Sequence, residues 1–141
     1  MSNQSSLVAA CFAMVVLVAL VGARLYLSRV AEMRRKRILP QAVALSAQMA
    51  AVAEDTRASD NFRNLFEVPV LFYALVAVAL AEGFTPDWLI GGAWGFVALR
   101  YLHSFIQCTY NRVMHRLPVF LLGFLLLLGL WTGFFLSRPA P

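Results

Sequence analysis

Apolar residues fall in four long runs along this chain of 141 residues, and a polar connection separates each run from the next. A bilayer core about 30 Å thick is spanned by roughly 20 apolar residues in a helix. The second run is purely apolar only from Val68 to Ala81, apart from Pro69, so it reaches this length only if its helix begins near Asn61. The pattern predicts an all-α fold, a four-transmembrane-helix bundle with helices at about 7–28, 60–82, 86–108 and 117–137.

Composition supports a multi-pass integral membrane protein. Hydrophobic residues make up 61% of the chain and charged residues 13%, whereas about 25% of residues are charged in an ordinary soluble domain. No internal repeat or low-complexity tract divides the sequence, so residues 1–141 are expected to form a single membrane domain. The connection from Ser28 to about Asp60 is rich in Ala and Gln, which favours partial helix. Pro40 marks a break in it, and residues from Ser46 onward are expected to lead into the second helix.

Eleven of the twelve basic residues lie on one side of the predicted membrane, and Arg138 is the exception. Short cytoplasmic loops collect Lys and Arg, so this side is predicted to be cytoplasmic and both termini to be non-cytoplasmic. The net charge of +5 therefore indicates a topology signal with attraction to membrane lipid. A nucleic-acid partner is not expected.

Polar residues occur at the cytoplasmic ends of all four predicted helices. Arg63, Asn64 and Glu67 can share one surface of the second helix, since they are three and four residues apart. We expect Glu67 to be buried and paired with Arg63 or with an arginine of another helix, because a carboxylate in a span needs a partner.

The other three helices carry matching groups at this depth. Arg100, His103 and Gln107 fall on one face of the third helix. Arg24 lies near the cytoplasmic end of the first helix, and Arg116 precedes the predicted start of the last. Ionisable residues in spans usually mark ligand or ion routes, although Arg24 and Arg116 are also long enough to reach the headgroups and the whole set is compatible with a structural clasp. Metal binding is not expected, because His103 has no second ligand at a suitable spacing.

Two stretches resemble the MAPEG family, the membrane-associated proteins in eicosanoid and glutathione metabolism. The segment "RNLFEVPVLF", residues 63–72, resembles the family's second-helix signature of Arg and Asn followed by Glu, Pro and aromatic residues. The segment "LRYLHSFIQCTYNRVMHR", residues 99–116, is similar to its second conserved block. The stretch "FEVPVLFY" looks like the bacterial, glutathione-transferase-like branch, which implies a location in a bacterial inner membrane.

The resemblance implies a homotrimer that binds glutathione as co-substrate between neighbouring subunits, near the cytoplasmic face. Arginine forks suit the two carboxylates of glutathione, and a nearby cation favours the thiolate form of its thiol. Arg116 matches the arginine that family members place near the sulfur, which makes it the candidate catalytic residue. The candidate binding residues that the resemblance supplies are Arg24, Arg63, Asn64, Glu67, Arg100 and His103.

The resemblance is incomplete where eicosanoid-forming members carry aromatic residues, since this chain has Gln107 and Phe120 there. A glutathione transferase or peroxidase that acts on lipophilic electrophiles is therefore the favoured interpretation. The alternative is a non-catalytic protein of the same fold that binds a lipid or another thiol. A proton-coupled transporter using Glu67 and His103 is less favoured, because transporter sites usually lie near the midplane of the membrane.

Overall fold

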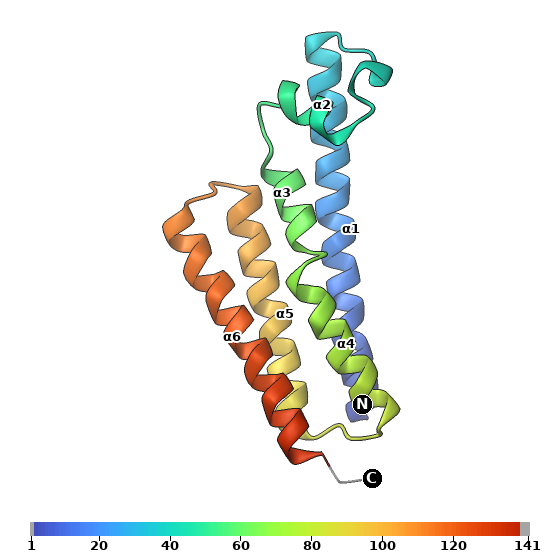
Figure 1. Cartoon of the computed structure of the whole chain (residues 1–141), viewed down its shortest axis with the longest axis vertical. Helices are drawn as coiled ribbons and strands as arrows, with labels where there is room; N and C mark the ends of the chain where they lie inside the picture. Colours follow the sequence, from blue (N-terminus) through green and yellow to red (C-terminus); the bar gives the residue numbers. More distant parts are fainter. Residues whose placement is uncertain (1, 139–141) are drawn as a thin grey trace.

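The computed structural model describes residues 2–138, which form an elongated bundle of helices (Figure 1). Residues 1 and 139–141 of the predicted domain lie outside the described part. The helices follow the predicted order, and the elements are α1 (Asn3–Lys36), the 3-10 turn η1 (Pro40–Val43), α2 (Ser46–Val52), α3 (Arg57–Asn64), α4 (Val68–Ala81), α5 (Asp87–Cys108) and α6 (Val113–Ser137).

Four segments of the structure are long and apolar enough to cross a membrane: α1, the combined α3 and α4, α5, and α6. The expected bundle of four spanning helices is confirmed. The second span is not one continuous helix, since residues 65–67 separate α3 from α4.

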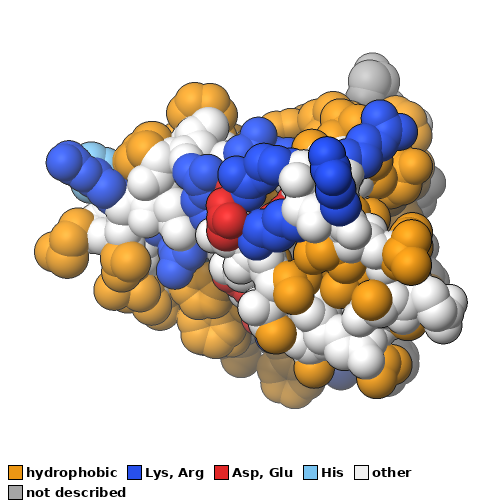
Figure 2. Space-filling view, turned by 90° about the horizontal axis from the view of Figure 1, so that it is seen from above, with side chains coloured by type: hydrophobic (Ala, Val, Ile, Leu, Met, Phe, Trp, Pro, Cys, Tyr) orange, Lys and Arg blue, Asp and Glu red, His pale blue; other side chains and the backbone are white. Residues whose placement is uncertain are grey.

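The start of α1 and the end of α6 lie at the same end of the bundle. The side-chain amide of Asn3 donates hydrogen bonds to the Thr85 carbonyl at 2.8 Å and to Asp87 at 2.9 Å, and Arg138 pairs with Glu82 at 2.8 Å. The opposite end, which we call the basic end, holds the last turns of α1, α2, the start of α3 and the connection from α5 to α6. Lys and Arg side chains gather there, as Figure 2 shows from above. The basic end carries Arg29, Arg34, Arg35, Lys36, Arg37, Arg57, Arg112 and Arg116.

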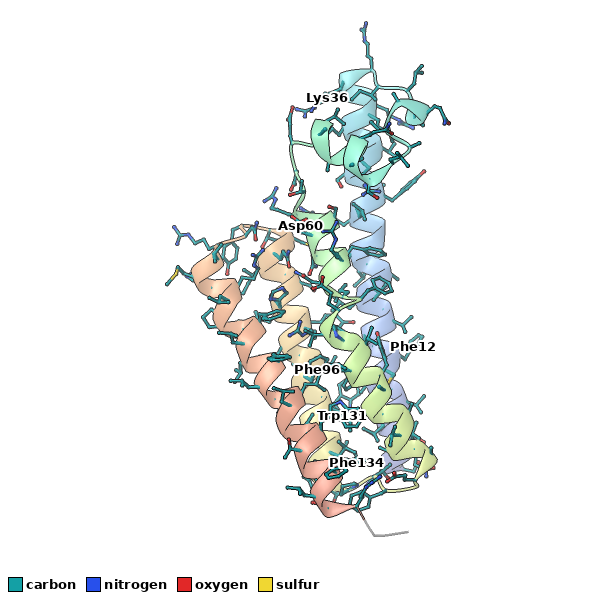
Figure 3. All side chains as sticks on the ribbon, in the orientation of Figure 1. Phe12, Lys36, Asp60, Phe96, Trp131 and Phe134 are labelled. Atoms are coloured by element: carbon teal, nitrogen blue, oxygen red, sulfur yellow. The ribbon has the colours of Figure 1, made fainter. Side chains whose placement is uncertain are left out.

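The core is built from apolar stripes that face the bundle axis. Alternating steps of three and four residues place one stripe of α1 on a single helix face. Phe72 of α4 stacks on Phe96 of α5, with ring centroids 4.9 Å apart, and Figure 3 shows Phe96 between the helices. Burying each aromatic ring contributes roughly 1.5–3 kcal/mol. The fully or nearly fully buried stripe of α1 comprises Leu7, Ala10, Met14, Leu17 and Val21.

The first helix extends eight residues beyond its predicted end near residue 28. Its apolar run ends there, but Glu, Lys and Arg are good helix formers, so the helix continues through the charged segment. Glu32 and Lys36 stabilise this extension as an i, i+4 ion pair at 3.1 Å. At 34 residues, α1 is about 51 Å long and rises above the other spans (Figure 1).

The sequence suggested that the segment from Ser46 leads into the second helix, but the structure shows a break between them. Helix α2 ends at Val52, and α3 begins only at Arg57. The backbone N–H of Glu54 donates to Glu32 at 2.7 Å, and Lys36 donates to the Val52 carbonyl. These bonds fold α2 back against the extension of α1, so that it caps the basic end.

Candidate functional site

The break between α3 and α4 sets the positions of the polar residues on the second span. Pro69 has no N–H, so it suits the first turn of a helix and not the interior; here it is the second residue of α4. Helix α3 therefore ends at Asn64, and Glu67 precedes α4 as its N-cap residue with φ −97° and ψ −93°. The short non-helical turn breaks the helical register between these two side chains.

Helix α5 presents a buried polar face to this break. Arg100, His103, Ser104 and Gln107 lie at i, i+3, i+4 and i+7, and each is at most 3% exposed. Four polar side chains buried on an apolar helix need partners, because each unpaired group costs about 1–3 kcal/mol.

Gln107 links α5 to α3. Its Oε1 accepts a hydrogen bond from Nδ2 of Asn64 at 3.1 Å and lies 2.9 Å from Nε2 of His103. Side-chain amide oxygens have two lone pairs, so one oxygen serves both partners. This shared oxygen fixes the positions of Asn64 and His103 relative to each other.

The guanidinium of Arg100 is buried without a carboxylate among residues 2–138. Its Cζ lies 5.1 Å from the ring centroid of Phe96 and 5.0 Å from that of Phe120, within the range of cation–π attraction. Nη2 donates to the Phe120 carbonyl at 3.4 Å. The guanidinium fits because Gly123 has no side chain, and a Cβ there would lie 2.9 Å from Nη2.

Helix α6 begins at Val113, four residues before the predicted start. Pro118 is consequently inside the helix and not in its first turn. Arg116 lies near the start of α6, and its Nη1 donates to Oδ1 of Asn111 at 2.8 Å. Asn111 adopts a positive φ of 47°, a conformation that Asn tolerates better than most residues, and it thereby anchors Arg116 at the basic end.

A cavity of about 210 Å³ opens between these elements. Asn64, His103 and Arg116 supply its polar wall. Arg116 is the only charged residue of the lining, and the positive end of the α6 dipole is close to it. The cavity can therefore hold a small anionic or ionisable group. Its apolar wall is formed by Val113, Leu117 and Phe120.

Behind the cavity, a second polar cluster joins α3 to α5. Asn61 is fully buried; its Nδ2 donates to Sγ of Cys108 at 3.3 Å, and its Oδ1 accepts from the Ser104 hydroxyl at 3.2 Å. These bonds satisfy both ends of the buried amide and hold α3 in register with α5.

Comparison with protein-family models identifies one match, to the MAPEG family, over residues 6–136. The chain belongs to the MAPEG family. It is an integral, multi-pass membrane protein with the all-helical bundle expected of that family. Searches of curated proteins and of solved structures returned no match.

Among the residues suggested by the MAPEG resemblance, the structure brings Asn64, His103 and Arg116 together in one cavity. Arg100 is one turn from His103 and contacts Phe120 of the cavity wall. Arg63 lines a different cavity, between α1, α2 and α3, and Arg24 is exposed on α1.

Glu67 departs from the expectation of a buried ion pair. It is exposed, and it forms no salt bridge to Arg63 or to any other residue between 2 and 138. The reason is local, since the turn at residues 65–67 ends the helix on which Glu67 and Arg63 were expected to pair.

Sequence reasoning placed Gln107 on the polar face of the third helix but gave it no role, and it did not single out Asn111. In the structure these two residues orient Asn64, His103 and Arg116. Asn111 is in a connection, where helical spacing gives no signal.

Proposed function

We propose that this MAPEG protein is a glutathione transferase or peroxidase that activates the glutathione thiol for attack on lipophilic electrophiles. The observation that carries the proposal is the cavity lined by Asn64, His103 and Arg116, whose only charged lining group is a cation. Glutathione is the thiol chosen because residues of both MAPEG-like segments, 63–72 and 99–116, line this cavity.

The chemistry follows from the charge. A free thiol has a pKa of about 8.5, and a guanidinium near the sulfur stabilises the thiolate. The S–H proton leaves to solvent, and the sulfur lone pair then forms a bond to an electrophilic carbon while the leaving group departs with its bonding electrons. Val113 and Leu117 are 56% and 48% exposed, so a substrate dissolved in the bilayer can approach along an apolar path.

The remaining candidate residues support a homotrimeric site. Arg24, Arg63 and Glu67 are exposed in the single chain, although charged groups on spanning segments normally face a protein interior or a ligand. A neighbouring subunit that covers them would bring the arginines to the glutathione carboxylates and Glu67 to its amine. The basic end is cytoplasmic in this proposal, in a bacterial inner membrane, according to the positive-inside rule.

Calorimetric titration of glutathione into the detergent-purified protein tests binding. Saturable binding that is lost in an Arg63→Ala, Glu67→Ala double variant is the expected result. Absence of binding at millimolar glutathione would contradict the proposal. Binding without conjugation of any electrophile would support the non-catalytic alternative.

The role of Arg116 is tested by substitution. Arg116→Ala is expected to lower turnover about 100-fold, as loss of a charge-stabilising donor typically does, with a much smaller effect on glutathione affinity. Arg112→Ala is the matched control, since Arg112 is exposed and near the same helix start but does not line the cavity. Turnover that is unchanged in Arg116→Ala, or equally reduced in both variants, would rule out Arg116 as the thiolate stabiliser.

A further inference from the structure

A second and larger cavity lies at the basic end, under α2. Its volume is about 470 Å³, within the usual range for small-molecule sites. Helices α1, α2 and α3 enclose it, and the lining includes Arg29, Asp60, Arg63 and the apolar residues Leu25, Met49 and Phe62. Figure 3 shows Asp60 where the bundle meets the α2 cap.

The length of α1 favours a position of this cavity at the depth of the lipid headgroups. Counted along α1 from Asn3, its wall runs from Leu25, at about 33 Å, to Glu32, at about 44 Å. The hydrocarbon core is about 30 Å thick, and the bilayer including its headgroups about 40–45 Å. The apolar residues line the cavity together with polar ones, so a ligand with both a polar head and an apolar tail fits it.

Two cations in the wall have no partner within the described chain. Neither Arg29 nor Arg63 takes part in any of the side-chain hydrogen bonds or salt bridges formed among residues 2–138. By contrast, Glu32 is paired with Lys36 at 3.1 Å and Asp55 with Arg57 at 2.7 Å. The free guanidinium groups suit a phosphate, which Arg binds with paired N–H donors.

One carboxylate in the wall is also free of ion pairs. Asp60 accepts a hydrogen bond from the Thr56 hydroxyl at 2.9 Å, but no cation lies within salt-bridge distance among the described residues. A carboxylate in this position can accept N–H bonds from an ammonium group. Since Glu32 and Asp55 of the wall are already paired, the groups free of ion pairs are two cations and one carboxylate. This set matches a zwitterion better than a purely anionic ligand.

We propose that the cavity under α2 binds the headgroup of an amine-bearing zwitterionic phospholipid, a phosphatidylethanolamine. Arg29 and Arg63 hold the phosphate, Asp60 accepts hydrogen bonds from the ammonium group, and Leu25, Met49 and Phe62 contact the glycerol and the start of the acyl chains. Arg63 also belongs to the proposed glutathione site, whereas Arg29 and Asp60 do not, so these two residues carry the test.

The test measures which lipids the full-length protein retains. Detergent-purified protein is equilibrated with an equimolar mixture of phosphatidylethanolamine, phosphatidylcholine and phosphatidylglycerol of identical acyl chains, repurified, and its bound lipids are quantified by mass spectrometry. Wild type is expected to retain phosphatidylethanolamine over phosphatidylcholine about tenfold, because a quaternary ammonium cannot donate hydrogen bonds. Equal retention, or preference for phosphatidylglycerol, would overturn the proposal.

Single substitutions distinguish recognition of the ammonium group from recognition of the phosphate. Asp60→Asn is expected to reduce the preference for phosphatidylethanolamine to about twofold or less with total phospholipid nearly unchanged. Arg29→Gln is expected to lower total retained phospholipid without changing the preference among headgroups. Arg112→Gln, which removes an exposed cation outside the cavity, should change neither; an effect equal to that of Arg29→Gln would show that general positive charge is responsible and would refute the site.

Discussion

At the scale of single residues, the shared oxygen of Gln107 is the contact on which the candidate site depends most. It serves both Asn64 and His103, and the side chain is only 1% exposed. Helical spacing places Gln107 on the same face as Arg100 and His103, but it does not reveal the contact with Asn64, which lies on another helix.

Replacing Gln107 tests this contact. Gln107→Leu keeps a similar volume but leaves the N–H groups of Asn64 and His103 without their acceptor, at a cost of about 1–3 kcal/mol. We expect a lower apparent unfolding midpoint in detergent and weaker glutathione binding. Gln41→Leu makes the same chemical change at an exposed position and should alter neither quantity. Unchanged glutathione binding in Gln107→Leu would mean that the network does not order the cavity.

The close packing of Arg100 against Gly123 leads to a second prediction at the residue scale. Gly123→Ala would place a Cβ 2.9 Å from Nη2 of Arg100 and force a buried guanidinium to move, with a typical overpacking cost of about 1–3 kcal/mol. Gly129→Ala is the matched control on the same helix, because its Cβ meets no atom within 4 Å and alanine favours helix. We expect Gly123→Ala alone to lower the apparent unfolding temperature, and equal midpoints for the two variants would contradict the packing described.

At the scale of elements, the α2 cap is held by charges and backbone bonds more than by apolar burial. Met49 is the only buried residue of α2. Glu54 bonds to Arg35 and Lys36, and the hydrogen bond from Arg35 is the larger reason why the pKa of Glu54 lies below its ordinary value. Among the α-helices of the described structure, α2 thus has the fewest buried residues.

Removing Glu32 should loosen this cap selectively. Glu32→Ala removes the acceptor of the Glu54 N–H bond and the partner of Lys36, while alanine preserves the helix of α1. We expect backbone amides of residues 46–56 to exchange hydrogen roughly five to ten times faster, with the spans unaffected. The control Glu82→Ala breaks the ion pair with Arg138 at the other end and should leave residues 46–56 unchanged. Equal hydrogen exchange of residues 46–56 in Glu32→Ala and wild type would argue against a role of the Glu32 contacts in holding α2.

The stability of the folded state is expected to fall at acid pH because of Asp55, which precedes α3. Hydrogen bonds from the Arg57 side chain lower the pKa of Asp55 from 3.8 to about 2. A carboxylate with a lowered pKa stabilises the folded state above its unfolded pKa, and this contribution is lost as the pH falls towards the folded pKa. Between about pH 4 and pH 2, wild type should therefore lose stability that Asp55→Asn lacks at every pH. Parallel pH dependence of the unfolding midpoints of the two proteins in this range would contradict the assignment.

At the scale of the whole molecule, the four spans could be predicted because the bilayer imposes their length and apolar character. Their ends could not. Helix α1 continues because charged residues are compatible with helix outside the membrane, and α6 begins early because Pro118 is accommodated within it.

The candidate site was predicted in part for a similar reason. Asn64, His103 and Arg116 meet because all three lie at a similar depth in the half of the bundle nearer the basic end. The expected burial and ion pair of Glu67 within the chain were wrong because residues 65–67 form a turn, and apolar periodicity does not reveal such a break. The positions of Arg24, Arg63 and Glu67 on the outer surface depend on what covers them, which a single chain does not contain.

The aromatic enclosure of Arg100 has a consequence for how the protein is made. Helix α5 has the lowest mean hydropathy of the four spans, with 1.2 against 2.4 for α6, and a charged arginine opposes insertion of a lone span, by up to about 2.5–3.5 kcal/mol at the helix centre. Phe120 and the notch at Gly123, which shelter that charge, are both on α6. We therefore expect helix α5 to gain its full stability in the bilayer only once α6 packs against it, which favours insertion of the two helices as a pair.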